Sequence, residues 1–91
     1  NFADVAVDAL GNFVVVWESY GQDGDDDGVF YRAFKKSGQP AGPDVQVNVY
    51  TRYIQGMPVI AMDASGNFVV AWRDGGQDGS VDGIYARVFK R

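Results

Sequence analysis

Apolar residues occur along the chain in short runs that are separated by turns rich in Gly, Asp, Asn and Pro. Val, Phe, Tyr and Trp dominate these runs, and such residue types are enriched in β-strands. No stretch shows the 3.6-residue spacing of an amphipathic helix. The pattern therefore predicts an all-β chain, with strands at residues 4–9, 12–19, 28–36, 44–51, 58–64, 67–74 and 83–91.

The chain contains an internal repeat. The segment "DALGNFVVVW" at residues 8–17 returns as "DASGNFVVAW" at residues 63–72. Aligning residues 4–36 with residues 59–91 needs no gap, and 18 of the 33 aligned pairs are identical at a constant offset of 55. We therefore predict a repeat unit of 55 residues, because a fixed period of this length is typical of repeat architectures.

Each unit contains the tight turn D-A-[LS]-G-N between its first two strands. Gly11 and Gly66 are expected to adopt a left-handed backbone conformation, which a Cβ atom would disfavour. Asp8 and Asp63 can accept backbone N–H bonds inside the same turn. The sequence thus predicts two equivalent β-hairpins.

Residues 12–19 decide which architecture we expect. Phe13, Val15 and Trp17 point to one face of this strand, and Val14 and Val16 point to the other. Because both faces are apolar and no helix is expected, we predict a sheet that is covered on both sides by other sheets. A four-stranded antiparallel sheet repeated in tandem is typical of a β-propeller blade, and a two-sheet β-sandwich is the alternative.

The number of strands has a consequence for assembly. Residues 1–55 supply the four strands of a first unit, and residues 56–91 supply the first three strands of a second, incomplete unit. A closed propeller needs at least about four blades, so one chain cannot close a ring. We expect outer faces lined by Phe13, Val15 and Phe68, and an unpaired edge strand at the end of the chain. The chain is therefore predicted to form a homo-oligomer, or to be covered by neighbouring repeats of a longer chain.

The motifs "G-N-F-V-V-x-W", "G-Q-D-G", "G-[VI]-[FY]-x-x-x-F" and "V-Q-V-N" resemble a repeat common in very large secreted bacterial proteins. Several of these proteins also carry calcium-binding glycine-rich repeats of the repeats-in-toxin kind. The resemblance covers nearly the whole chain. It implies an extracellular, non-catalytic, tandemly repeated module, and it provides no catalytic residue to carry over.

Two Asp-rich loops begin at the Asp of each "GQDG" motif and spell D-x-D-x-D-G from Asp23 and D-x-S-x-D-G from Asp78. Alternate oxygen-bearing side chains can converge on one Ca²⁺ ion, and the Gly permits the sharp turn. The acid that closes an EF-hand is absent from both loops, so solvated hairpin loops are the alternative interpretation. The metal ligands that this spacing predicts are Asp23, Asp25 and Asp27 in the first loop and Asp78, Ser80 and Asp82 in the second.

Aromatic and basic residues provide further candidate positions. Trp17, Trp72 and Tyr53 could stack on a sugar ring, and the alternative is that the tryptophans pack between sheets. Arg32 and Arg87 stand at equivalent points of the two units. We expect each arginine to pair with a loop Asp.

Composition narrows the functional classes. The chain has 91 residues, no His and no Cys, and its 8 Lys and Arg and 12 Asp and Glu give a net charge of −4. An acidic chain of this kind argues against nucleic-acid partners, and no apolar run approaches the ~20 residues of a membrane span. No Ser-His or Cys-His pair is available for nucleophilic catalysis. We predict a non-enzymatic, secreted structural or binding module that is stabilised by calcium, with a lectin-like carbohydrate-binding propeller or a glycosidase fragment as alternatives.

Overall fold

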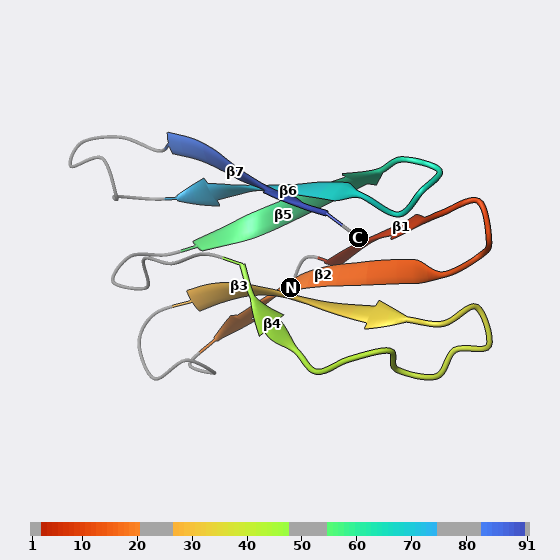
Figure 1. Cartoon of the computed structure of the whole chain (residues 1–91). Coiled ribbons are helices and arrows are strands. Elements are labelled where there is room, and N and C mark those ends of the chain that lie inside the picture. Colours follow the sequence, from red (N-terminus) through yellow and green to blue (C-terminus); the bar gives the residue numbers. More distant parts are fainter. Residues whose placement is uncertain (1–2, 21–26, 48–54, 75–82, 91) are drawn as a thin grey trace.

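The computed structural model describes residues 3–20, 27–47, 55–74 and 83–90, and all regular elements in these ranges are strands (Figure 1). The prediction of an all-β chain is confirmed. No helix occurs among the described residues, so none of them forms a helix long enough to cross a membrane. The strands are β1 (Ala3–Val7), β2 (Phe13–Tyr20), β3 (Asp27–Phe34), β4 (Val45–Gln46), β5 (Gln55–Met62), β6 (Phe68–Asp74) and β7 (Gly83–Phe89).

The strands form two open antiparallel sheets, each in the order of the sequence. Sheet 1 has the order β1-β2-β3-β4, and sheet 2 has the order β5-β6-β7. The strand expected at residues 44–51 is described only at its start, and residues 48–54 lie outside the described ranges. The pairing continues one residue past β4, because Val47 N donates to Val29 O at 2.7 Å. Each sheet is thus a meander, in which every strand pairs with the next one along the chain.

The two predicted turns are confirmed. Gly11 has φ of 89° and Gly66 has φ of 93°, a region that L side chains rarely adopt. In the first turn, Asp8 Oδ1 accepts from the N–H groups of Leu10 and Asn12. Equivalent bonds to Asp63 Oδ1 from Ser65 and Asn67 form the second turn. The local sequence therefore determines both hairpins in the same way.

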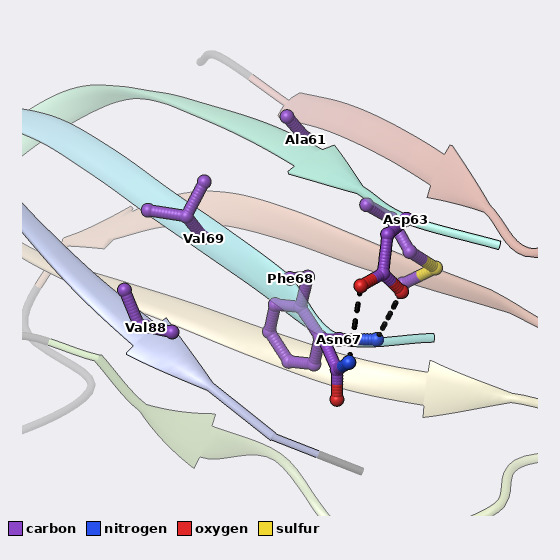
Figure 2. A pocket seen from close by; sticks show the side chains of 7 residues that line it. Ala61, Asp63, Asn67, Phe68, Val69 and Val88 are labelled. Atoms are coloured by element: carbon purple, nitrogen blue, oxygen red, sulfur yellow. Dashed lines mark hydrogen bonds between the residues drawn. The ribbon is translucent and has the colours of Figure 1, made fainter. Parts of the chain in front are cut away.

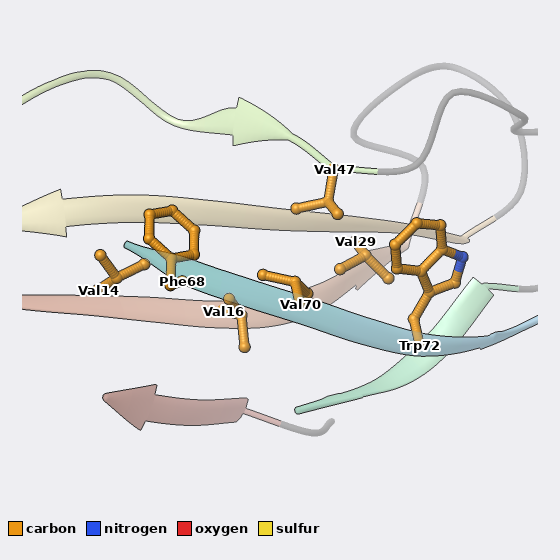
Figure 3. Packing of buried hydrophobic residues seen from close by; sticks show 7 residues of the cluster. All are labelled: Val14, Val16, Val29, Val47, Phe68, Val70 and Trp72. Carbon is orange, nitrogen blue, oxygen red and sulfur yellow. The ribbon is translucent and has the colours of Figure 1, made fainter. Parts of the chain in front are cut away.

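The two sheets pack against each other and enclose the core (Figure 3). Strand β5 lies against β1, β2 and β3. Two rings of sheet 2, those of Phe68 and Phe89, contact the ring of Tyr31 in sheet 1, with centroids 5.1 and 4.9 Å apart. The buried members of the core cluster come from both sheets and are Val14, Val16, Val29, Val47, Phe68, Val70 and Trp72.

One prediction about these faces is wrong. Each sheet is covered by the other on one face and leaves its second face open, as we expected for the outer faces of a single chain, but the sequence assigned the wrong face of sheet 2 to the outside. Phe68, which we expected on an outer face together with Phe13 and Val15, is 5% exposed between the sheets. The reason is that sheet 2 turns toward sheet 1 the face that carries Phe68, while sheet 1 turns toward sheet 2 the face that carries Val14 and Val16.

Candidate functional site

The predicted calcium ligands lie almost entirely outside the described residues. Asp27 is the first residue of β3, where its backbone is paired with Tyr20, and the other five predicted ligands fall in residues 21–26 and 75–82. Among the residues that the structure describes, no group of three acidic side chains is placed to hold a metal ion. Calcium binding by the Asp loops therefore stays a prediction.

The candidate sugar-stacking residues have different environments. Trp72 is 7% exposed in the core and stacks on Tyr85 with centroids 6.3 Å apart, so it offers almost no ring surface to a ligand. Trp17 is partly exposed on the far side of sheet 1 and stacks on Phe30 at 6.2 Å. Tyr53 lies outside the described ranges. The structure thus places one of the three in the core and one on an open face.

The two equivalent arginines make different contacts. Arg32 Nε donates to Gly42 O at 2.9 Å and lies 3.8 Å from Asp44 Oδ1, so its acidic neighbour follows the turn after β3. Arg87 Nη1 reaches across to sheet 1 and donates to Val47 O at 3.0 Å. Arg32 therefore acts within its own sheet, whereas Arg87 links the two sheets.

The face of sheet 1 that points away from sheet 2 is apolar and aromatic, and we name it open face 1. Phe13 and Phe34 stack on it with ring centroids 5.2 Å apart. Val5 and Val7 are 58% and 59% exposed there. Open face 1 consists of Val5, Val7, Phe13, Val15, Trp17, Phe30 and Phe34, and Arg32 lies on it opposite Val15.

The corresponding face of sheet 2, open face 2, is aliphatic and hollowed. It consists of Val59, Ala61, Val69, Ala71, Ile84, Ala86 and Val88, and Arg73 lies on it opposite Ile84. A shallow hollow of about 370 Å³ opens there, between Ala61, Val69 and Val88 (Figure 2). Met62, Phe68, Asp63 and Asn67 complete its lining. Such a surface suits an apolar group, because the walls offer it little but hydrocarbon.

Among the residues that line this hollow, only Asp63 and Asn67 have polar side chains, and both lie in the turn between β5 and β6. Asn67 Nδ2 donates to Asp63 Oδ2 at 3.0 Å (Figure 2). This hydrogen bond is the main reason why the pKa of Asp63 lies below the usual value for Asp; desolvation opposes it, and the backbone N–H groups of Asn67, Ser65 and Gly66 lower the pKa further. The Asp63 carboxylate thus accepts hydrogen bonds within the β5–β6 turn and stabilises that hairpin.

Reasoning from the sequence missed the hollow. It identified an apolar pattern on both faces of the second strand of each unit, but it gave Phe13 and Phe68 the same environment. The signal that distinguishes them lies in the substitutions between units, such as Tyr31 in β3 against Ala86 in β7.

Comparison of the chain with models of protein families, with curated proteins and with solved structures finds no match.

Proposed function

We propose that the chain is a non-catalytic structural repeat module that acts outside the cell, and that its sheets are blades of a propeller-type stack. Its task is to supply β-sheets that pack on one another in series. The resemblance to repeats of large secreted bacterial proteins supports the extracellular setting. The meander topology of both sheets supports the assignment as blades, because a propeller blade has this strand order.

The observation that carries this proposal is the way the two sheets stack. Repeat-equivalent residues face opposite ways: Val14 is buried in sheet 1, whereas its equivalent Val69 is partly exposed in sheet 2, where Phe68 is buried instead. Units that pack through two different faces can continue in series, whereas units that pack through the same face stop at a pair. A serial stack is what a tandem repeat needs.

Polar contacts between the sheets support a structural task as well. Asp4 Oδ2 accepts a hydrogen bond from Ile60 N at 3.1 Å, and Ala9 N donates to Ala64 O at 3.2 Å. Together with the bond from Arg87 to Val47 O, these contacts fix how one sheet sits on the other. Side chains that stabilise the junction between units in this way suit a scaffold.

We include calcium in the proposal, with the Asp loops as its ligands. Titration of Ca²⁺ by calorimetry tests this part, with Asp25→Asn and Asp27→Asn as controls. We expect a dissociation constant of about 10⁻⁴–10⁻³ M, the range of extracellular modules. No heat and no change in melting temperature at millimolar Ca²⁺ would remove calcium from the proposal and leave the stacking intact.

A series of tandem chains tests the structural role itself. Chains with two, three, four and five copies of residues 1–55 should become more stable with each added copy, because each copy adds a junction. Urea unfolding measures this dependence. Stability that does not change with copy number, or hydrolysis of chromogenic glycosides by the 91-residue chain, would contradict a non-catalytic scaffold.

A further inference from the structure

We propose that open face 2 binds open face 1 of a second copy of this chain, with the Phe13–Phe34 pair of the second copy seated over the hollow. This inference rests on the proposed structural role and names the partner and the contact. The junction between sheets 1 and 2 inside one molecule serves as its template, because both open faces repeat the residues of that junction.

The first step is the equivalence of the aromatic faces. Inside the molecule, sheet 2 presents Phe68, Val70 and Trp72 to sheet 1. The residues 55 positions earlier are Phe13, Val15 and Trp17, which lie on open face 1 and are of the same types. The stacked Phe68–Phe89 pair, at 4.9 Å, corresponds to the stacked Phe13–Phe34 pair, at 5.2 Å. Open face 1 is therefore a second copy of the surface that already packs against sheet 1.

The second step is the equivalence of the receiving faces. Sheet 1 receives the aromatic face of sheet 2 on a surface that includes Val14 and Ala33. On open face 2 the corresponding residues are Val69 and Val88. These two residues line the hollow together with Ala61, which corresponds to Ala6 (Figure 2). The hollow thus lies where the template places the phenylalanine pair of a neighbouring sheet.

The two receiving faces also differ, and the differences set the expected strength. Tyr31, which contacts both Phe68 and Phe89 inside the molecule, corresponds to Ala86. Asp4, which accepts a hydrogen bond from Ile60 N, corresponds to Val59. The junction between two copies therefore lacks a ring contact and a hydrogen bond, and we expect it to be weaker than the internal junction, with a dissociation constant in the micromolar range.

The geometry determines the form of the assembly. Open face 1 and open face 2 are different surfaces, so the contact is head-to-tail and leaves one open face at each end of a pair. Head-to-tail contacts produce rings when the rotation closes and open-ended chains when it does not. Association should therefore continue past the dimer as the concentration rises.

Cysteine cross-linking tests the contact, because the natural chain contains no Cys. Ala9 N donates to Ala64 O at 3.2 Å inside the molecule. The template therefore places Ala64 of one copy beside Ala9 of the next. We expect an equimolar mixture of the Ala9→Cys and Ala64→Cys chains to form the mixed disulfide at least tenfold faster than either chain forms a disulfide with itself. The double variant, which should close within one chain, is the control for disulfide geometry.

Substitutions on open face 2 test the same contact independently, through the strength of self-association. Val88, 65% exposed beside the hollow, lies on open face 2, whereas Gln39, exposed in the turn after β3, lies outside both open faces. Sedimentation velocity should show association at least tenfold weaker for Val88→Asp and unchanged for the control Gln39→Asp.

Equal rates for the mixed and the self-paired disulfides would overturn the proposal, as would association that Val88→Asp leaves unchanged. A monomer at all concentrations would overturn it too. Failure of this contact alone leaves the tandem chains free to gain stability with copy number, so it is distinguishable from failure of the structural role.

Discussion

The two sheets contain nearly the same strand sequence and bury opposite faces of it. In β2, Val14 and Val16 are fully buried, while Phe13 and Trp17 are partly exposed. In β6, Phe68 and Trp72 are buried, while Val69, the equivalent of Val14, is partly exposed. The compared residues of these two strands cannot produce this difference, because Phe, Val and Trp stand at the same positions in both. The position of each strand in the stack decides which face is covered.

The serial packing that we propose would account for the apolar character of both faces of the strand. A unit that packs in series needs one apolar face for the unit before it and a second for the unit after it. In the present molecule each sheet has only one such neighbour. Under the proposed serial packing, a further sheet would cover each of these open faces.

The largest expected effect comes from truncating the equivalent phenylalanines. Phe68→Ala should lower the free energy of unfolding by about 3–5 kcal/mol, because it leaves a cavity in the core. Phe13→Ala should cost about 1 kcal/mol in dilute solution, since that ring is partly exposed. Urea unfolding at submicromolar concentration measures both. Equal losses would mean that the two faces are buried alike.

A smaller effect is expected at the hydrogen bond that Asp4 makes between the sheets. Asp4→Val introduces the residue found at the equivalent position 59 and leaves Ile60 N without this acceptor. We expect a loss of about 1–2 kcal/mol, typical of an unmade bond at a partly buried N–H group. Val59→Asp, at a position 56% exposed, is the matched control and should leave stability nearly unchanged. A larger loss from the control than from Asp4→Val would contradict the assigned junction.

The arginine pair sharpens the comparison further. Arg87→Met removes a hydrogen bond between the sheets and should cost about 1 kcal/mol. Arg32→Met removes contacts within sheet 1, including an ion pair to Asp44 at the surface, and should cost about 0.5 kcal/mol. Chemical unfolding of both variants at two salt concentrations is the measurement. A greater loss of unfolding free energy for Arg32→Met than for Arg87→Met would contradict the assigned contacts.

The smallest effect is the pH dependence of the second turn. The folded state holds the pKa of Asp63 below its usual value, so the ionised carboxylate adds stability above the unfolded pKa of about 3.9. That contribution is lost as the pH falls through the folded pKa. Asp63→Ala should therefore lower the melting temperature at pH 7, and the difference from the natural chain should shrink toward pH 2. A difference in melting temperature that grows on acidification would show that the ionised carboxylate of Asp63 does not stabilise the folded state.

The strands and the turns could be predicted from the sequence, whereas the stacking could not. Strand content follows from runs of Val, Phe and Tyr, and the turns follow from Asp8, Gly11 and their equivalents, all of which act over a few residues. Which face of a strand is buried depends on contacts such as those between Tyr31 and Phe68, 37 positions apart. The hollow is a product of that stacking, so local pattern could not reveal it.

The most direct test of opposite-face burial uses the two tryptophans, which are equivalent in sequence and are the only ones in the chain. Trp17→Phe leaves Trp72 as the single fluorophore, and Trp72→Phe leaves Trp17. In dilute solution Trp72 should emit at shorter wavelength and resist quenching by acrylamide, whereas Trp17 should be readily quenched and become protected as the concentration rises. Equal quenching of the two, or stronger protection of Trp17 in dilute solution, would contradict the account.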